Sequence, residues 1–314
     1  MSVRVEAVTP PVALGEGPHW STKEQALYYV DIFAQNVHRF HPASGTHSTL
    51  HIEGGPVTFV VPHVDELNTF VVSVGRDLAL VIWPDTAKDA TITSPTAIIA
   101  SVDHTHEDNR FNDGKCDPLG RLWAGTMGNT DVPENPLPYL GSLYHLAEDG
   151  KVTRVLDKVS ISNGLAWSED RRTFYYVDTC EYKLEAFTCD LEKGTLGERR
   201  TIYDYRAGGL YPAFPDGLTI DTQGRLWVAC FGAAKVHCIN PRSGKIEDSV
   251  TLPTDHVTSV TFGGRDLDEL YVTTTTKRLN KEQLAAQPSA GAVFRVTGLR
   301  TKGRPNADCK FCTK

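Results

Sequence analysis

Short apolar stretches recur along the chain, and each follows glycine-flanked polar residues and a turn. The clearest copy runs from Arg110 to Trp123, where Asn112-Asp113-Gly114 leads through an Asp-Pro-x-Gly turn to an apolar, aromatic strand. Weaker copies begin near five other positions, namely Glu16, Val57, Asn163, Asp216 and Ser259. Self-similarity with a period of roughly 40 to 55 residues indicates a repeat architecture.

Within one repeat, the spacing of apolar and polar positions predicts a meander of four short strands. In the first copy, two strands fall within residues 15–30, a third at 37–40 and a fourth at 49–52. Helical periodicity is nearly absent, except for a short helical turn at 280–286. Six such meanders predict an all-β fold, a six-bladed β-propeller, because a sandwich or a barrel would not produce this repeat.

The two ends of the chain are expected to close this ring. Residues 3–8 alternate apolar and polar side chains, and they are placed to complete the last blade beside residues 293–296. Nothing between the repeats resembles a linker, which argues against separate β-domains in series. We predict a single domain over residues 1–314, ending in a short polar tail from about residue 301.

Composition narrows the classes of function. The chain has 314 residues and a net charge of -7, with 40% hydrophobic and 23% charged residues, which is typical of a soluble globular protein. This charge gives no long-range attraction to nucleic acid or to an anionic membrane, and no apolar run approaches membrane-spanning length. We therefore expect a cytoplasmic monomer without nucleic-acid or membrane partners.

The seven cysteines do not form a recognisable framework. Cys116 and Cys230 lie in predicted strands, where small buried thiols are expected. Cys309 and Cys312 have the spacing of half a zinc or redox site, but no second pair accompanies them.

The repeat brings particular polar residues together. In a propeller, the innermost strand of every blade starts at the same mouth of the central channel, so equivalent repeat positions converge. These positions are Glu16, Asn112, Asn163 and Asp216, with residues 57–58 and 258–259 from the weaker copies. Buried carboxylates cluster when a cation or a substrate compensates them. A ligand set made only of oxygen favours calcium, magnesium or manganese over a thiolate-type zinc site.

Each of these residues also has a purely structural interpretation. Asn-Gly and Asp-Gly pairs are common turn formers, although Glu16 between two glycines is harder to explain in that way. Asp31 and Asp178 end second strands, where they either cap turns or support the site. Arg110 lies on the same strand face as Asn112, so it is either an ordinary surface arginine or a bidentate ligand for an anionic or hydroxylated substrate.

Several ordered motifs resemble the regucalcin, gluconolactonase and luciferin-regenerating-enzyme family of six-bladed propellers over nearly the full length. The first motif is Gly15-Glu16-Gly17-Pro18-His19-Trp20, and the second runs from Asn109 to Lys115, followed by Asp117-Pro118-x-Gly. The others are Ala124-Gly125-Thr126-Met127, the stretch from Ile161 to Ser168, Pro215-Asp216-Gly217, and Thr258 to Gly264 with Glu269-Leu270-Tyr271-Val272-Thr273.

The resemblance implies a metal-dependent hydrolase of lactones or related esters. Carried over residue by residue, it assigns one divalent cation (calcium, magnesium, manganese or zinc) to Glu16, Asn163 and Asp216. It assigns substrate contacts to Arg110 and Asn112, and the role of general base to Asp216. The cation would polarise the lactone carbonyl and orient a water.

One family position differs. Vertebrate regucalcins have a substrate-contacting glutamate where this chain has Thr130, within a loop at 128–139 that also differs. Two other functions therefore stay open: an enzyme for a heterocyclic, luciferin-like substrate, to which the aromatic-containing segment 208–214 is suited, and a non-catalytic calcium-binding regulator. Arg110 favours catalysis over calcium storage, because a nearby positive charge weakens a site that only holds metal.

Overall fold

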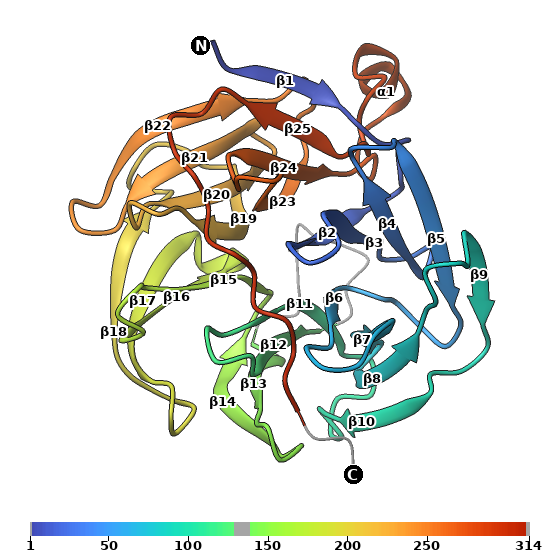
Figure 1. The fold of residues 1–314 in the computed structure, drawn as a ribbon. Coiled ribbons are helices and arrows are strands. Elements are labelled where there is room, and N and C mark those ends of the chain that lie inside the picture. The colour runs from blue at the N-terminus through green and yellow to red at the C-terminus, as the bar shows by residue number, and fades with distance from the viewer. Residues whose placement is uncertain (1, 129–138, 312–314) are drawn as a thin grey trace.

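The protein is a ring of six β-sheets around a central channel (Figure 1). This is a computed structural model, and it describes residues 2–128 and 139–311. Each sheet contains four antiparallel strands, which confirms the predicted six-bladed β-propeller. No helix in the described part of the chain has the length and apolar character needed to span a membrane.

The first three blades follow one another along the chain. The first comprises β2 (Gly15–Ser21), β3 (Ala26–Asp31), β4 (Asn36–His41) and β5 (Thr46–Ile52). The second comprises β6 (Val60–Pro62), β7 (Thr69–Val74), β8 (Asp77–Ile82) and β10 (Ala97–Ser101). Between β8 and β10, β9 (Asp89–Ile92) crosses to the first blade and pairs in parallel with β5, an edge strand that the sequence did not predict. The third comprises β11 (Arg110–Cys116), β12 (Leu122–Met127), β13 (Gly141–Leu146) and β14 (Val152–Val159).

The remaining blades complete the ring. The fourth comprises β15 (Ser162–Trp167), β16 (Thr173–Asp178), β17 (Lys183–Asp190) and β18 (Thr195–Asp204), with a short 3-10 turn, η1 (Thr179–Glu181), after β16. The fifth comprises β19 (Phe214–Ile220), β20 (Leu226–Phe231), β21 (Lys235–Asn240) and β22 (Lys245–Thr251). The sixth comprises β23 (Val257–Gly263), β24 (Glu269–Thr274), β25 (Phe294–Thr297) and, from the other end of the chain, β1 (Arg4–Ala7).

The predicted closure of the ring is confirmed. β1 pairs antiparallel with β25, and Val5 lies opposite Val296. The short helix expected near 280–286 is also present as α1 (Lys281–Ala286). Its start is fixed by a capping box, in which the Asn280 side chain accepts from the Gln283 backbone and the Gln283 side chain accepts from the Asn280 backbone.

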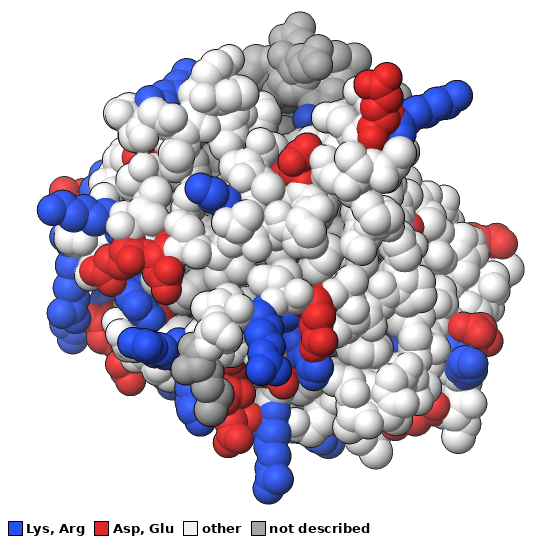
Figure 2. Space-filling model, turned by 90° about the horizontal axis from the view of Figure 1, so that it is seen from above, with Lys and Arg blue, Asp and Glu red and all other residues white. Residues whose placement is uncertain are grey.

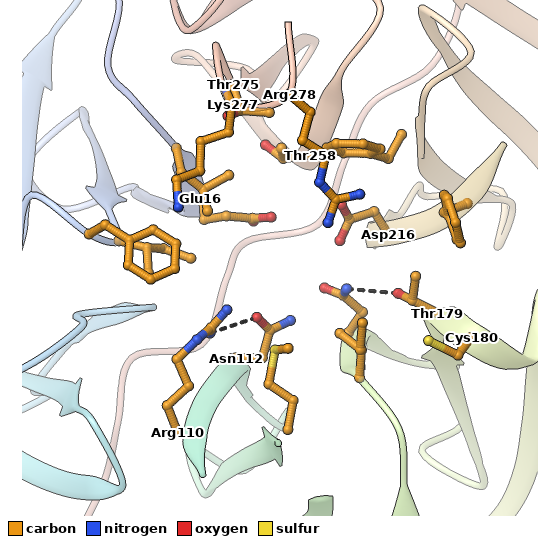
Figure 3. A pocket seen from close by; sticks show the side chains of 18 residues that line it. Glu16, Arg110, Asn112, Thr179, Cys180, Asp216, Thr258, Thr275, Lys277 and Arg278 are labelled. Carbon is orange, nitrogen blue, oxygen red and sulfur yellow. Dashed lines mark hydrogen bonds between the residues drawn. The ribbon is translucent and has the colours of Figure 1, made fainter. Parts of the chain in front are cut away.

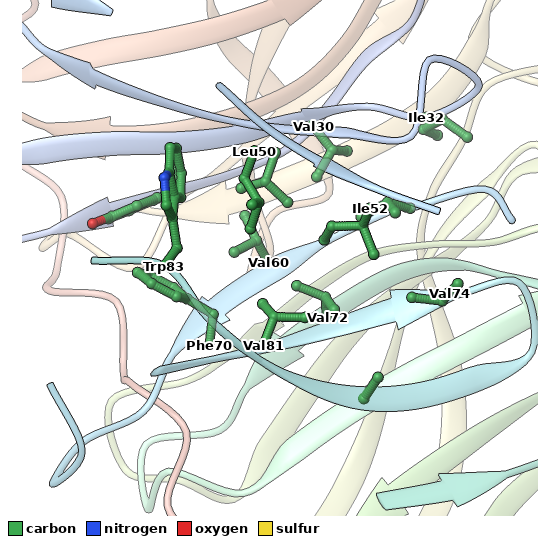
Figure 4. Packing of buried hydrophobic residues seen from close by; sticks show 14 of the residues in the cluster. Val30, Ile32, Leu50, Ile52, Val60, Phe70, Val72, Val74, Val81 and Trp83 are labelled. Carbon is green, nitrogen blue, oxygen red and sulfur yellow. The ribbon is translucent and has the colours of Figure 1, made fainter. Parts of the chain in front are cut away.

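The hydrophobic core lies between neighbouring blades. Figure 4 shows the cluster between the first two blades, where Val30 and Leu50 face Phe70, Val81 and Trp83. Because each inner blade surface packs on the next blade, central strands such as β3 and β7 are buried at every position. Full burial of one such side chain stabilises the fold by about 1.5–3 kcal/mol.

In two blades, an aspartate at the same repeat position fixes the turn after the innermost strand. In the third blade, the Asp117 carboxylate accepts from Trp123 Nε1 at 3.1 Å and from the Arg121 guanidinium. In the fifth blade, Asp221 accepts from Trp227 Nε1 at 3.1 Å and from Arg225. Buried carboxylates need such partners, which explains why the turn aspartate and the strand tryptophan recur together in the repeat.

The segment 300–311 lies across the mouth of the channel at which the innermost strands end (Figure 1). Its hydrogen bonds and ion pairs reach residues of all six blades. Thr301 and Phe311 are buried, so this segment is a packed strap although its composition is polar. Cys309 is buried beside His63, and Cys312 lies outside the described residues.

Candidate functional site

A cavity of about 350 Å³ opens at the mouth where the innermost strands begin (Figure 3). Five of the blades contribute polar side chains to it from equivalent positions at or near the start of these strands: Glu16, Asn112, Asn163, Asp216 and Thr258. Arg110 lines the same cavity. The structure therefore brings together the five residues to which the sequence assigned metal or substrate contacts: Glu16, Arg110, Asn112, Asn163 and Asp216.

Two predicted positions do not take part. Thr58 of the second blade is fully buried and bonded to Ser73, with 2.7 Å between the hydroxyl oxygens, and it does not line the cavity. The expectation that residues 57–58 reach the mouth is wrong, because the innermost strand of this blade is only three residues long and begins at Val60. Thr130 lies outside the described residues.

The two carboxylates of the cavity are strongly perturbed. Glu16 and Asp216 are only 9% and 7% exposed. Burial raises the pKa of Glu16 well above its usual range, and the charges of Asp216 and Asp113 raise it further. Burial also raises the pKa of Asp216, again reinforced by Asp113, whereas Arg278 opposes this shift. Burial removes water from these two carboxylates, and their negative charges repel each other. A bound cation would offset both effects.

Two oxygens of the site lack a hydrogen-bond partner among the described residues, Asn163 Oδ1 and Asp216 Oδ1. The Asn163 amide is held from its other side, because its Nδ2 donates to Thr179 Oγ1 at 2.8 Å. The Thr179 hydroxyl in turn donates to the Pro215 carbonyl at 2.9 Å. A buried acceptor without a donor is costly, so these two oxygens fit a bound cation.

Glu16, Asn163 and Asp216 together suit a hard divalent cation. The set contains two carboxylates and one amide oxygen, without nitrogen or sulphur ligands. Among residues 2–128 and 139–311, no cluster of three histidine, cysteine or acidic side chains is placed to hold a metal, so a cation in this cavity would need the amide oxygen of Asn163 beside the two carboxylates. Such a three-ligand set leaves coordination positions open for water and substrate.

Asp31 and Asp178 support the site from behind, which is one of the two roles expected for them. The Asp31 carboxylate accepts from the backbone nitrogens of Ala13 and Leu14, at 2.9 and 3.1 Å. Asp178 does the same for Ser160 and Ile161, at 2.9 and 3.0 Å. Each aspartate thus fixes the segment that leads into an innermost strand, just before Glu16 or Asn163.

Arg110 and Asn112 form a connected pair. The Arg110 guanidinium donates to Asn112 Oδ1 at 2.9 Å and to the Phe111 carbonyl at 2.8 Å (Figure 3). Asn112 Nδ2 donates to the Ser162 carbonyl at 2.9 Å, which ties the third blade to the fourth. Burial lowers the pKa of Arg110 to about 10, so the guanidinium is charged at neutral pH. In this geometry Asn112 holds Arg110 in place at the cavity wall.

Below the cavity, the channel contains a further ionisable pair. Burial raises the pKa of Asp113 to about 6 and lowers that of Lys115 to about 8. Lys115 Nζ donates to the Leu218 carbonyl at 3.3 Å. Asp113 therefore adds negative charge beneath Glu16 and Asp216, while Lys115 offsets part of it.

Sequence reasoning missed several residues of the cavity. Phe33, Thr179, Phe231, Lys277 and Arg278 all line it. Thr179 directly follows the supporting Asp178, and this adjacency is the one signal that would have indicated it. Phe231 is the last residue of β20, and the others come from segments after second strands, where the repeat pattern is weakest.

Comparison with known proteins agrees with this fold. The family described as SMP-30/Gluconolactonase/LRE-like region matches residues 14–276. The regucalcin of Gallus gallus is 41% identical over 305 residues, which is 97% of both chains. A solved luciferin-regenerating enzyme is 35% identical with a TM-score of 0.90, covering 99% of this chain and 100% of that one. A calcium-binding regucalcin structure from Agrobacterium tumefaciens is 26% identical with a TM-score of 0.85, covering 98% and 97%.

The family match extends over residues 14–276, and the Gallus gallus regucalcin aligns with 97% of the chain. The match covers the segments that contain Glu16, Arg110, Asn163 and Asp216. The chain belongs to the SMP-30/gluconolactonase/LRE-like family.

Proposed function

We propose that this protein hydrolyses lactones with the help of one divalent cation held by Glu16, Asn163 and Asp216. The observation that carries the proposal is the convergence of two buried carboxylates and an unpartnered amide oxygen in a cavity of about 350 Å³. The family, which includes gluconolactonases by its description, supports the same class of reaction.

The residues of the cavity divide the work of such a hydrolysis. When bound, the cation supplies Lewis acidity, which polarises the lactone carbonyl and makes a water more acidic. Asp216 orients the attacking water and accepts its proton at a carboxylate oxygen. Arg110, fixed by Asn112, donates to the substrate and stabilises negative charge that develops on oxygen. Arg110 and Asn163 are preorganised, because Asn112 and Thr179 hold them in place before substrate arrives.

The aromatic lining favours a second candidate function, conversion of a heterocyclic substrate. Phe33, Phe214 and Phe231 line the cavity and offer flat apolar surfaces to a ring system. The solved structure with a TM-score of 0.90 is a luciferin-regenerating enzyme. A third candidate, a calcium-binding regulator without catalysis, is supported by the Agrobacterium tumefaciens structure, which is described as a calcium-binding protein.

A pH-drop assay with and without chelator tests the proposal. We expect hydrolysis of sugar lactones, loss of that activity with EDTA, and recovery with calcium, magnesium or manganese. An aromatic lactone in the same panel tests the heterocyclic alternative. Binding of calcium without turnover of any lactone would contradict the hydrolase proposal and support the regulator.

The variant Asp216→Ala tests the site itself. It is expected to abolish both turnover and metal binding, measured by the same assay and by calorimetric titration with manganese, because it removes a ligand and the proton acceptor together. Asp248→Ala, which removes an exposed carboxylate of the fifth blade, is the control and should change neither. Full activity in a folded Asp216→Ala protein would overturn the assignment.

A further inference from the structure

Two cysteines that lie far apart in the sequence come together where the strap meets the third blade. Cys116 is the last residue of β11, and Cys309 belongs to the strap at 300–311. Both are free cysteines of one hydrophobic cluster, and their exposed fractions are 5% and 0%. The two thiols are hydrogen-bonded to each other, a contact that adds to burial in raising the pKa of Cys116 above its usual range.

Backbone contacts on both sides hold Cys309 at this place. Its nitrogen donates to the Pro62 carbonyl of β6 at 2.7 Å, and the nitrogen of Lys310 donates to the Gly120 carbonyl at 2.7 Å. Gly120 lies in the turn that follows Cys116, and a Cβ at Gly120 would be only 2.9 Å from the Lys310 Cβ. The strap thus ends between the second and third blades (Figure 1), in close contact with both, so the two thiols stay adjacent.

The surroundings of the pair do not suit a metal ion. Among residues 2–128 and 139–311, no group of three histidine, cysteine or acidic side chains is placed to hold a metal. His63 forms a β-bridge with Cys309, but both of its ring nitrogens are engaged. Its Nε2 donates to the Phe311 carbonyl at 3.1 Å, and its Nδ1 accepts from the Glu66 backbone nitrogen at 3.1 Å. The reaction open to two adjacent thiols without a metal is the formation of a disulfide.

A cavity of about 210 Å³ gives small molecules a route to the pair. It lies between the strap and the third, fourth and fifth blades, and Cys116 lines it together with Trp167, Ile220 and Asn306. A water molecule needs only about 15 Å³ of such space, so hydrogen peroxide has room beside the Cys116 side chain. Because burial keeps this thiol protonated, its oxidation is expected to be slow.

We propose that Cys116 and Cys309 are a site of reversible oxidation, at which a disulfide fastens the strap to the third blade. The oxidant is a small hydroperoxide such as hydrogen peroxide. The Cys116 sulphur attacks one peroxide oxygen, the O–O bond breaks, and a sulfenic acid forms with release of one water. The Cys309 sulphur then attacks the Cys116 sulphur and displaces a second water. The two thiols thus lose two protons and two electrons to the peroxide, and a dithiol such as dithiothreitol reverses the change.

The bond is expected to stabilise the ring. It closes a covalent loop that contains the fourth, fifth and sixth blades, because Cys116 ends the innermost strand of the third blade and Cys309 lies near the end of the chain. A disulfide that closes a long loop restricts the unfolded chain. The oxidised protein should therefore melt roughly 5 °C above the reduced protein.

Peptide mapping of the full chain tests whether the bond forms. The protein is incubated with hydrogen peroxide, its remaining thiols are blocked with N-ethylmaleimide in denaturant, and the digest is analysed by mass spectrometry. We expect a peptide pair that joins Cys116 to Cys309 and that separates after treatment with dithiothreitol. If these two thiols stay unlinked while the partly exposed Cys189 is oxidised, or if Cys116 is joined to Cys312 instead, the inference is wrong.

Thermal unfolding tests whether the bond fastens the strap. Cys309→Ala and Cys116→Ala are each expected to lose the roughly 5 °C difference between oxidised and reduced samples. Cys230→Ala removes another fully buried thiol, in β20, and should keep the difference. Because the difference is measured within each variant, a loss of stability from the substitution itself does not enter. A linked pair that melts at the same temperature as the reduced protein would show that the bond does not fasten the strap.

Discussion

At the scale of single residues, the side chains proposed to hold a cation are oriented by neighbours outside the proposed ligand set. Asn163 presents an oxygen to the cavity because its nitrogen is committed to Thr179, and Thr179 is committed to the Pro215 carbonyl. This chain of bonds links η1 of the fourth blade to β19 of the fifth. Thr179 therefore decides which end of the Asn163 amide faces the cavity, and under the proposed function it is a positioning residue for a metal ligand.

The variant Thr179→Val tests this role. It keeps the shape of the side chain but removes the acceptor for Asn163 Nδ2, so the amide loses its fixed orientation. Metal affinity is expected to fall about 10-fold or more, as is usual when such an outer partner is lost. Calorimetric titration with calcium measures the change.

Thr188→Val is the control, because it makes the same substitution at an exposed position of β17 in the same blade. It should leave the affinity for calcium unchanged. If Thr179→Val binds calcium as tightly as the parent protein, the orientation of Asn163 does not depend on Thr179.

At the scale of strands, the glycines beside the site residues have a packing function. Gly164 and Gly217 lie within β15 and β19, so the Asn-Gly and Asp-Gly pairs are not turns. A Cβ on Gly164 would lie 2.8 Å from the Asp216 carbonyl, and one on Gly217 would lie 1.9 Å from Ser259 Oγ. The innermost strands thus approach one another closely, as the proposed cation site between blades requires.

The variant Gly164→Ala tests this close approach. Its methyl group would push β15 away from β19, and the backbone neighbours leave little room for relaxation. We expect a loss of about 1–3 kcal/mol in the free energy of unfolding, together with weaker metal binding, because Asn163 and Asp216 are moved apart. Chemical denaturation and calcium titration measure the two effects.

Gly150→Ala provides the control, since Gly150 lies in a turn with φ of 82° and open space around it. It should cost about 1 kcal/mol of stability through backbone strain without changing metal affinity. Unchanged stability and calcium affinity in Gly164→Ala would show that the strands tolerate a wider spacing.

At the scale of the whole molecule, the strap at 300–311 joins the blades at the mouth opposite the site. Thr301 donates to Asp221 in the fifth blade, and Cys309 pairs with the backbone of the second. Acidic and basic side chains are interspersed on the molecular face in Figure 2. The site and the strap therefore occupy opposite ends of one channel.

The variant Phe311→Ala tests the contribution of the strap. Phe311 is 6% exposed, and its ring lies edge-on to His63 with centroids 5.4 Å apart. Truncation is expected to lower the free energy of unfolding by roughly 3 kcal/mol, as in other large-to-small core substitutions. Metal affinity of the folded protein should persist, because the strap lies far from the ligands along the channel.

Leu67→Ala is the control, because Leu67 is 71% exposed and its truncation removes little buried surface. Thermal and chemical unfolding of both variants give the comparison. If Phe311→Ala unfolds at the same temperature as the parent protein, the strap adds no stability to the ring.

The sequence alone determined the blade number, the closure by the terminal strands, and the convergence of Glu16, Asn112, Asn163 and Asp216. These follow from the repeat, because equivalent positions in a closed ring must face the same channel. The predictions from the sequence are wrong where the repeat is interrupted. The second blade has a short innermost strand, so Thr58 misses the mouth, and β9 leaves its own blade to pair with β5.

Only the tertiary structure decided which other side chains line the cavity beside Glu16, Asn163 and Asp216. Thr179, Lys277 and Arg278 come from segments after second strands, whose length and path no periodicity fixes. The strap has a polar composition, and its burial follows from the channel mouth that it covers. The local sequence pattern specifies a strand and which of its side chains face the core. The contacts of a loop depend instead on its length and on its path between two strands of the ring.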